Sequence, residues 1–339
     1  MRFLIIGGGS IGRRHLENLL GLSHTAYVVE PARQRANEIE ERYGVRAFHN
    51  LEEALKGRYD AALVCNPTIY HARTALLLAE AKTHLFIEKP VSHDLKKIDC
   101  LLNLVKKNRL RALVGYNFKF HPSFKLMKTL LDSGAIGKVL SFTVIAGQYL
   151  PDWHPYEDYR KGYSANRSLG GGALLDSHEL AYLQWFLGPI AAIACAAGKY
   201  SSLEIDTEDT AEMIVRTKGG ATGNVHVDYI QHPYRRIYYF YGSRGALEWD
   251  KSRKVVSLYR VKDKRWRYFK EPKDYDSNQM YIDEMKHFTN VLKEKEESVT
   301  DISSGIRTLK VMLAAKRASK LKRFIDLTPY PLPMTVGQT

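Results

Sequence analysis

The sequence is poor in cysteine and has no long hydrophobic run. Its three cysteines, Cys65, Cys100 and Cys195, are scattered along 339 residues and match no spacing of metal ligands. We therefore expect reduced thiols, no disulfide framework and no metal site. No apolar run approaches the roughly 18–20 residues of a membrane span. A strand predicted to begin at residue 2 leaves no room for a secretory signal peptide, so we expect a cytoplasmic protein without a membrane segment.

Acidic residues are also scarce relative to basic ones. The 37 Asp and Glu stand against 51 Lys and Arg, which gives a formal net charge of +14. Residues 1–118 hold 18 basic and 12 acidic residues and the remainder holds 33 and 25, so the excess is shared and argues against a nucleic-acid-binding module. Two basic stretches, Lys251–Lys270 and Arg307–Arg323, are interpreted as a solvated hairpin and the outer face of a helix. Attraction of an anionic substrate or of an acidic neighbouring subunit is the alternative.

Short apolar strands and amphipathic helices alternate through the first third of the chain. This alternation predicts βαβ units and an α/β domain with a doubly wound parallel sheet. A chain longer than about 250–300 residues exceeds one hydrophobic core, so we expect two domains, at residues 1–118 and 119–339. The first has predicted strands at residues 2–6, 27–29, 46–48, 60–65, 84–88 and 112–115, and predicted helices at 13–20, 32–43, 51–56, 71–81 and 94–107.

The pattern changes after residue 118, where β-rich segments dominate. They predict an α+β domain with a large, open, mainly antiparallel sheet. The aromatic strand Arg236–Tyr241 predicts that a second copy covers the open face, in a homodimer or homotetramer. The predicted strands are residues 139–149, 190–200, 211–217, 223–230, 236–242 and 255–261, and the predicted helices are 122–133, 279–295 and 303–323. A further single helix is predicted to open after Gly170-Gly171-Gly172 and to run to Gly188.

A glycine-rich turn joins the first strand to the first helix. Gly7-Gly8-Gly9-Ser10-Ile11-Gly12 has the G-x-G-x-x-G spacing that binds the pyrophosphate of a dinucleotide. Gly7 permits the tight turn, Gly9 lets the backbone approach the phosphates, and Gly12 lets the helix close on the strand. Ser10 and Ile11 open that helix, whose free N–H groups attract the anion.

An acidic residue follows where recognition of a ribose is expected. Glu30 ends the second predicted strand, and a carboxylate at this point accepts both ribose hydroxyls of an adenosine. This arrangement favours NAD as the cofactor. Because arginine binds a 2′-phosphate, Arg33 and Arg35 keep NADP as the less favoured alternative.

Three other strand ends carry polar residues, at the edge where parallel sheets bind ligands. They are Cys65–His71, Glu88-Lys89-Pro90 and Gly115–Pro122. The predicted cofactor residues are Gly7, Gly9, Ser10, Ile11, Gly12, Glu30, Arg33, Asn66, Pro67, His71, Glu88, Lys89 and Asn117.

With Gly170-Gly171-Gly172, Asp176 and His178 added, these motifs resemble the Gfo/Idh/MocA family of nicotinamide-dependent oxidoreductases over essentially the whole chain. The resemblance implies hydride transfer between the nicotinamide and a hydroxyl-bearing carbon of a sugar, polyol or nucleotide sugar. It places Lys89 beside the reacting oxygen as a proton relay, often with a cis bond before Pro90. From the residues alone, a desolvated lysine near another cation is expected to have a pKa lowered toward neutrality.

The resemblance also implies that Asp176 orients the sugar and that His178 is an acid or base, with an ordinary imidazole pKa near ~6.5. The pair departs from the family pattern, because these residues are two apart where three or four is common, and Ala181 replaces a frequent acid. Residues i and i+2 do not share a helix face, so both reach one ligand only if Asp176 precedes the helix. Asp176 could instead serve as the helix cap.

The segment Gln148–Lys161 is dense in aromatic and hydrogen-bonding residues, so it is predicted to be a substrate loop. It resembles a family branch linked to surface-polysaccharide sugars. A packed loop at a domain or subunit interface is the alternative. The predicted substrate-binding residues are Lys89, Lys119, Trp153, Tyr163, Asn166, Asp176 and His178.

Two other functions fit the same residues. Some relatives oxidise a sugar transiently and return the hydride after elimination, epimerisation or glycoside hydrolysis, so no net redox change results. A cofactor-binding regulator without catalysis is also conceivable because of the altered spacing of Asp176 and His178.

Overall fold

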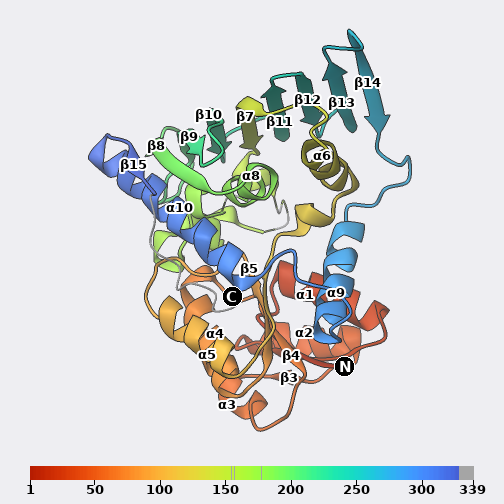
Figure 1. Ribbon diagram of the computed structural model, residues 1–339. Helices are drawn as coiled ribbons and strands as arrows, with labels where there is room; N and C mark the ends of the chain where they lie inside the picture. Colours follow the sequence, from red (N-terminus) through yellow and green to blue (C-terminus); the bar gives the residue numbers. More distant parts are fainter. Residues whose placement is uncertain (154, 156, 177, 328–339) are drawn as a thin grey trace.

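The computed structural model describes residues 1–153, 155, 157–176 and 178–327. His154 and Tyr156, which belong to the predicted substrate loop, lie outside the described residues. The chain forms two layered parts: a parallel sheet with helices in the lower half of Figure 1, and a large sheet with helices on one side in the upper half.

The first part contains a six-stranded parallel sheet in the order β3-β2-β1-β4-β5-β6, which is the Rossmann order. Its strands are mainly buried apolar residues, with the exposed or partly buried ones mostly at the strand ends, as expected for a parallel sheet covered on both faces. The strands are β1 (Arg2–Ile6), β2 (Thr25–Val29), β3 (Ala47–Phe48), β4 (Ala61–Val64), β5 (His84–Glu88) and β6 (Ala112–Gly115). The helices are α1 (Ser10–Gly21), α2 (Arg33–Tyr43), α3 (Leu51–Ala54), α4 (His71–Glu80) and α5 (Ile98–Lys107).

A helix from the far end of the chain completes this first part. Helix α9 (Gln279–Leu292) packs beside α1, and its Phe288 contacts Phe3 and Phe86 of the parallel sheet with ring centroids 6.2 and 5.5 Å apart. Met285 and Val291 belong to the same buried cluster. A cut at residue 118 therefore separates the parallel sheet from a helix that covers it.

The second part is a nine-stranded sheet in the order β14-β13-β12-β11-β7-β10-β9-β8-β15. Neighbouring strands are antiparallel except for the parallel pair β7 and β10, so the expected mainly antiparallel sheet is confirmed. The strands are β7 (Val139–Gly147), β8 (Ile190–Gly198), β9 (Thr210–Thr217), β10 (Thr222–Asp228), β11 (Arg235–Gly242), β12 (Gly245–Asp250), β13 (Val255–Arg260), β14 (Arg265–Lys270) and β15 (Ile325–Asp326).

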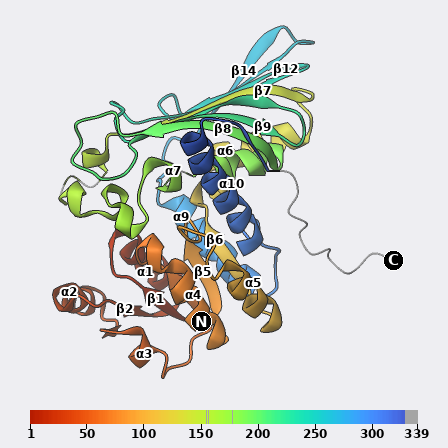
Figure 2. The same cartoon turned by 90° about the vertical axis from the view of Figure 1, so that its left-hand side faces the viewer.

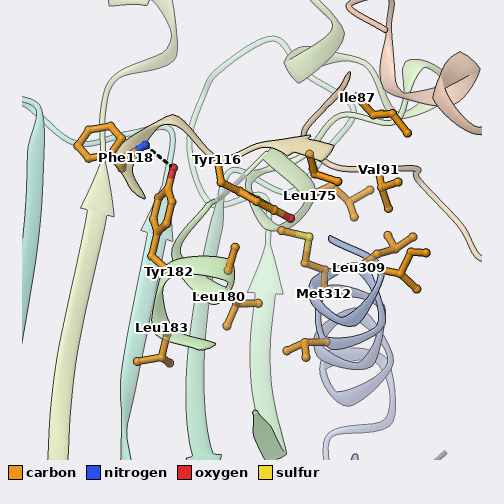
Figure 3. Packing of buried hydrophobic residues seen from close by; sticks show 14 of the residues in the cluster. Ile87, Val91, Tyr116, Phe118, Leu175, Leu180, Tyr182, Leu183, Leu309 and Met312 are labelled. Carbon is orange, nitrogen blue, oxygen red and sulfur yellow. Dashed lines mark hydrogen bonds between the residues drawn. The ribbon is translucent and has the colours of Figure 1, made fainter. Parts of the chain in front are cut away.

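In the part of the chain that the structure describes, helices cover only one face of this sheet. Figure 2 shows α6 (Pro122–Asp132), α8 (Glu179–Leu187) and α10 (Ile302–Leu321) on the face toward the first part. Close packing there joins the two parts, since Ile87 and Val91 of the first part lie in one cluster with Leu309 and Met312 of α10 (Figure 3). Between β7 and α8, the described residues form four 3-10 turns within Leu150–Leu169 and a short helix, α7 (Ala173–Asp176).

Several sequence predictions were wrong in detail. The helix predicted at 94–107 begins at Ile98, because Lys97 has a left-handed backbone with φ of 63°. The single helix predicted after the glycine run is two helices, α7 and α8. Strands β12, β14 and β15 were not predicted; Arg265–Lys270 pairs with β13 although all six of its residues are exposed, as the interpretation of a solvated hairpin requires.

Among the described residues, no helix is long and apolar enough to cross a membrane. Over the same residues, no three His, Cys, Asp or Glu side chains gather in a way that could hold a metal ion.

Candidate active site

The glycine turn has the geometry that a dinucleotide requires. A Cβ on Gly12 would lie 1.9 Å from the carbonyl oxygen of Gly7, so α1 packs against the turn without room for a side chain. Gly7 has φ of 104°, which favours glycine. In contrast, a Cβ on Gly9 would meet no atom within 4 Å, so the backbone there faces open space. No side chain caps α1 and its first turn holds no acidic residue, which leaves its N–H groups for an anion.

Glu30 lies beside this turn and is almost completely buried. Its Oε2 accepts the N–H of Gly8 at 2.9 Å, and its Oε1 accepts the N–H of Ala32 at 2.9 Å. Arg35 pairs with the same carboxylate at 3.2 Å, whereas Arg33 begins α2 and is exposed. The residues present therefore fit a dinucleotide with a ribose at Glu30 and phosphates at Gly9.

Two strand-end loops are tied together by a buried histidine. The ring of His71 lies 2.7 Å from the carbonyl oxygen of Asn66 and 2.8 Å from that of Pro90. The Asn66 amide donates to Thr74, and the Lys89–Pro90 peptide bond is cis. His71 therefore holds the loop after β4, which contains Pro67, against the loop that carries Lys89.

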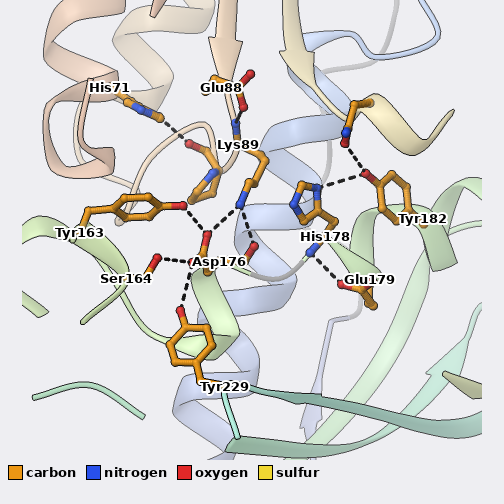
Figure 4. Close-up of polar contacts among 12 residues, drawn as sticks. His71, Glu88, Lys89, Tyr163, Ser164, Asp176, His178, Glu179, Tyr182 and Tyr229 are labelled. Atoms are coloured by element: carbon orange, nitrogen blue, oxygen red, sulfur yellow. Dashed lines mark hydrogen bonds and ion pairs between the residues drawn. The ribbon is translucent and has the colours of Figure 1, made fainter. Parts of the chain in front are cut away.

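Lys89 and Asp176 form the centre of the polar site (Figure 4). The Lys89 ammonium donates to Asp176 Oδ1 at 2.7 Å and to the Asp176 main-chain carbonyl at 2.9 Å. The two side chains are 13% and 1% exposed. Lys89 extends from the end of β5, and Asp176 ends α7, so the pair joins the two parts of the molecule.

Three hydroxyl groups complete the surroundings of the Asp176 carboxylate. Tyr163 donates to Oδ1 at 2.5 Å, while Ser164 and Tyr229 donate to Oδ2 at 2.6 and 3.1 Å. Each carboxylate oxygen therefore accepts two hydrogen bonds, which uses the capacity of an ionised carboxylate. Asp176 is occupied by protein donors, and its side chain does not cap α8.

The buried pair fixes the protonation of both partners. Burial alone disfavours the Lys89 cation, but the Asp176 carboxylate outweighs it and raises the pKa of Lys89 above its ordinary value. Burial likewise opposes the Asp176 anion, but Lys89 and the hydrogen bonds lower the pKa of Asp176 below its usual range. The expectation of a lysine pKa near neutrality was wrong, because the group beside Lys89 is an anion.

His178 lies next to this pair, at the start of α8. Its Nδ1 is 3.1 Å from the hydroxyl of Tyr182, one helical turn further on, and the two rings are stacked with planes 14° apart. Burial and the nearby cations Lys89 and Arg236 hold the pKa of His178 well below 6.5. The imidazole is therefore neutral at physiological pH, which corrects the expectation of an ordinary value.

A buried ion pair fixes the backbone at His178. The main-chain N–H of His178 donates to Glu179 Oε2 at 3.0 Å, and Arg236 Nε lies 2.9 Å from Glu179 Oε1. Arg236 also lies over the ring of Phe118, 4.3 Å from its centroid. These contacts anchor the start of α8 to strand β11.

Three other predicted site residues, Trp153, Asn117 and Glu88, contact neighbours of this centre. Trp153 packs edge-on against Tyr229, with ring centroids 5.3 Å apart, so it borders the surroundings of Asp176. Asn117 contacts Tyr182, with its Oδ1 3.3 Å from the hydroxyl. Glu88 Oε1 lies 2.7 Å from His15 Nε2, behind Lys89.

Two predicted substrate residues point elsewhere. The Lys119 ammonium donates to the Val299 carbonyl at 2.7 Å and lies beside the Tyr116 and Trp185 rings; burial lowers its pKa to about 8. Asn166 Oδ1 accepts the N–H and the hydroxyl of Ser168, capping a 3-10 turn. Neither side chain contacts Lys89, Asp176 or His178 in the part of the chain described.

Sequence reasoning missed Tyr182, Ser164 and Tyr229. Tyr182 could have been found from the sequence, because it lies four residues after His178, which is the spacing of neighbours on one helix face. Ser164 adjoins the predicted Tyr163. Tyr229 carried no local signal, since the end of β10 brings it to Asp176 from 53 residues away.

Comparisons with known proteins agree with this geometry. Two family models match the chain: an oxidoreductase family NAD-binding Rossmann fold at residues 1–116 and a GFO/IDH/MocA C-terminal domain at residues 124–248. The chain is 29% identical to a myo-inositol 2-dehydrogenase of Thermotoga maritima over an alignment of 350 positions. The alignment covers 96% of this chain and 98% of that protein.

Solved structures show the same fold. A levoglucosan dehydrogenase in complex with NADH and levoglucosan has a TM-score of 0.88 at 18% identity, covering 97% of this chain and 100% of that one. The WlbA dehydrogenase from Bordetella pertussis, in complex with NADH and UDP-GlcNAcA, has a TM-score of 0.82 at 20% identity, with 99% of each chain covered. The glycine turn, Glu30 and the two matched domains together identify this chain as a member of the Gfo/Idh/MocA family of NAD-binding oxidoreductases.

Proposed function

We propose that this protein is an NAD-dependent dehydrogenase that oxidises a hydroxyl-bearing carbon of a sugar, polyol or nucleotide sugar, or reduces the corresponding carbonyl. The observation that carries the proposal is the juxtaposition of a charged lysine, Lys89, with a neutral histidine, His178, at the ligand-binding edge of a dinucleotide-type sheet. The named activities of the relatives, on inositol, levoglucosan and nucleotide sugars, support this class of substrate.

The cofactor is assigned to the edge of the parallel sheet. Gly7, Gly9 and Gly12, with Ser10 and Ile11, hold the pyrophosphate, and Glu30 accepts the ribose hydroxyls. When bound, NAD supplies a hydride acceptor at its nicotinamide ring. The remaining assigned cofactor residues, at other strand ends and at the start of α2, are Arg33, Asn66, Pro67, His71, Glu88 and Lys89. Asn117, whose amide contacts Tyr182 and Met280, is left without an assigned cofactor contact.

Lys89 and His178 have different roles, since His178 accepts a proton and Lys89 stabilises a negative charge. The neutral His178 imidazole takes the proton from the substrate hydroxyl during oxidation. The Lys89 ammonium keeps its proton and stabilises the negative charge on the substrate oxygen, because its pKa is raised by Asp176. Two of its hydrogens are held by Asp176, which leaves the third for the substrate.

Asp176 is assigned a positioning role rather than a direct contact with the sugar, since its oxygens are occupied. Trp153 and Tyr163 are the assigned substrate contacts, because Trp153 packs against Tyr229 and the Tyr163 hydroxyl shares Asp176 Oδ1 with Lys89. An aromatic ring of this kind stacks on the apolar face of a sugar. Lys119 and Asn166 are left without an assigned substrate contact.

The test is a direct assay of nucleotide binding and redox turnover. We would release any nucleotide from the purified protein, titrate it with NADH and NADPH by nicotinamide fluorescence, and screen sugars, polyols and nucleotide sugars for NADH production. Tight NADH binding with turnover supports the proposal. Product formed without NADH accumulation indicates the redox-neutral alternative, and NADH binding without turnover on any substrate indicates the regulator.

We also propose that the protein is cytoplasmic, where free cysteines stay reduced. We further propose that it forms a homodimer or homotetramer through the open face of the large sheet. Strand register places Ile214, Tyr241 and Tyr268 on the uncovered face, where they are 51, 43 and 65% exposed. Light scattering should show an oligomer that Ile214→Glu with Tyr241→Glu dissociates. Tyr200→Glu, at an exposed position outside the strands, is the matched control; a monomeric native protein would refute the proposal.

A further inference from the structure

The hydroxyl of Tyr182 lies at the meeting point of three polar groups. The main-chain N–H of Phe118 donates to it at 3.3 Å, Asn117 Oδ1 lies 3.3 Å away, and His178 Nδ1 lies 3.1 Å away. Tyr182 is completely buried. A tyrosine hydroxyl has one hydrogen to donate and two lone pairs, so three contacts fill its capacity.

The direction of each hydrogen bond follows from the groups whose role as donor or acceptor is fixed. The Phe118 N–H is always a donor, so it occupies one lone pair of the Tyr182 oxygen. The single Tyr182 hydrogen then goes either to Asn117 Oδ1 or to His178 Nδ1. Which of the two receives it depends on what Asn117 presents to the hydroxyl.

Met280 settles the orientation of the Asn117 amide. The Asn117 Nδ2 group lies 3.6 Å from the Met280 sulfur, within the longer range of hydrogen bonds to sulfur. A thioether sulfur accepts hydrogen bonds but cannot donate them. The reverse orientation would put the amide oxygen against sulfur without a donor between them. The amide oxygen therefore faces Tyr182, and because Asn117 is 5% exposed it needs a donor there.

We propose that Met280, Asn117 and Tyr182 form a hydrogen-bond chain of fixed direction that holds His178 in its Nδ1–H tautomer. Tyr182 donates to Asn117 Oδ1 and accepts from the Phe118 N–H and from His178 Nδ1–H. The lone pair of His178 is thereby placed on Nε2, the ring nitrogen that the chain leaves for a ligand. Tyr182, Asn117 and Met280 are positioning residues, because they act through His178.

The catalytic meaning of this tautomer rests on the proposed function. A histidine that removes a hydroxyl proton must present an unprotonated nitrogen to the substrate. In the Nε2–H tautomer, the nitrogen facing the ligand would already carry a hydrogen, and the basic nitrogen would face Tyr182. The chain therefore prepares the resting protein to accept a proton, as oxidation of an alcohol requires.

The tautomer can be measured without turnover. Nitrogen NMR spectra of the full-length protein labelled with 15N-histidine distinguish protonated from unprotonated ring nitrogens, and His178→Gln identifies the signals of His178 among the 12 histidines. At neutral pH, with and without NAD, we expect a protonated Nδ1 and an unprotonated Nε2. An Nε2–H tautomer, an imidazolium or an even mixture would overturn the inference.

Two variants test the chain itself. Asn117→Leu removes the acceptor of the Tyr182 hydrogen, so Tyr182 is expected to donate to Nδ1 and the His178 spectrum to convert to the Nε2–H pattern. Tyr182→Phe removes the hydroxyl and is expected to give a mixture of tautomers. An unchanged Nδ1–H spectrum in both variants would show that the chain does not set the tautomer.

Kinetics then separate positioning from folding. Tyr182→Phe is expected to lower kcat by up to about tenfold, which is less than the roughly 10²–10⁴-fold that a general base contributes, because a mixture of tautomers leaves part of His178 in its basic form; KM and NADH affinity should change less than about twofold. Tyr116→Phe, which removes another fully buried hydroxyl with its ring 6.1 Å from that of Tyr182, is the matched control and should leave both the spectrum and kcat unchanged. An Nδ1–H tautomer in the native protein together with full activity of the His178→Gln variant would refute the proposed role of His178 and leave the tautomer assignment intact.

Discussion

The Lys89 ammonium makes two hydrogen bonds to a single residue, one to the Asp176 carboxylate at 2.7 Å and one to its main-chain carbonyl at 2.9 Å. Because Lys89 directly follows β5 and Asp176 ends α7, this pair connects the dinucleotide-type sheet with the second part of the molecule. It also keeps the lysine charged. The site thus has a permanent cation beside a neutral imidazole.

Removing the lysine charge should strongly lower turnover while nucleotide binding persists. Lys89→Met is expected to lower kcat by about 10²–10³-fold, since the cation stabilises a negative charge that develops only during the reaction. NADH affinity should stay within a few-fold of the native value, because the glycine turn and Glu30 are untouched. Stopped-flow kinetics and fluorescence titration measure the two effects, and a Lys89→Met enzyme with native turnover would contradict the assignment.

The same variant has a predictable cost in stability. Asp176 is 1% exposed, so loss of Lys89 leaves a buried carboxylate without its cation, at a cost of about 3–5 kcal/mol in the free energy of unfolding. Lys89→Met with Asp176→Asn should recover part of this loss, because the amide needs no counter-ion. Urea unfolding of both variants tests this. Equal stability of the single and the double variant would show that the unpaired Asp176 charge does not cause the loss.

Local sequence patterns predicted where the glycine turn, Glu30 and Lys89 lie in the parallel-sheet part. The glycine turn and Glu30 belong to the first βαβ unit, β1-α1-β2, and Lys89 follows β5 of the same parallel sheet, so all three lie at the carboxyl ends of parallel strands. The alternating pattern of the first third predicted the parallel sheet, and the β-rich remainder predicted the mainly antiparallel sheet. The strand β14 escaped prediction because its exposed residues, from Arg265 to Lys270, show no burial pattern.

The environment of the proposed catalytic groups, Lys89 and His178, could not be predicted in the same way. Lys89 and its partner Asp176 are 87 residues apart, and only the packed structure reveals that an anion, not a cation, controls the lysine pKa. Tyr229 reaches Asp176 through the pairing of distant strands. The role of Asp176 changed for the same reason, since its four hydrogen-bond donors come from three separate segments of the chain.

Two glycines of the cofactor turn should respond oppositely to alanine. Gly12→Ala is expected to destabilise the protein, because its Cβ would lie 1.9 Å from the Gly7 carbonyl oxygen. Gly9→Ala should fold with native stability, since its Cβ meets no atom within 4 Å, but should lose NADH affinity at least about tenfold as the methyl group occupies the phosphate site. Thermal unfolding and NADH titration of the pair test this. Native NADH affinity in Gly9→Ala would place the phosphates elsewhere.

Glu30 should determine the preference for NAD over NADP. Its carboxylate repels a 2′-phosphate and pairs with Arg35 at 3.2 Å. Glu30→Gln keeps an oxygen for the Gly8 N–H but removes the charge and frees Arg35, so we expect weaker NADH binding and stronger NADPH binding. Glu30→Gln with Arg35→Ala should lose the gain for NADPH. An unchanged ratio of the two affinities in the single variant would exclude Glu30 from the choice of cofactor.

Two histidines should affect acid stability with opposite sign. The pKa of His178 is lowered by burial and by Lys89 and Arg236, so as pH falls below about 6.5 the unfolded chain binds a proton that the native protein does not. His178 therefore reduces stability by as much as about 1.4 kcal/mol for each pH unit below that point, until its native pKa is reached. His178→Gln removes this loss, and the variant should become more stable relative to the native protein between pH 7 and pH 5.

His226 supplies the matched comparison, because hydrogen bonds to Asp228 and Glu212 raise its pKa. Its stabilising contribution is fully present below the unfolded pKa of about 6.5 and is lost as pH rises through the higher native value. His226→Gln should therefore become less stable relative to the native protein over the same fall from pH 7 to pH 5. Urea unfolding of the native protein and both variants at pH 5, 6, 7 and 8 gives the two slopes. Slopes of the same sign would mean that at least one of these imidazoles has a different charge in the folded protein, and a His178 slope like that of His226 would remove the neutral base on which the proposed oxidation depends.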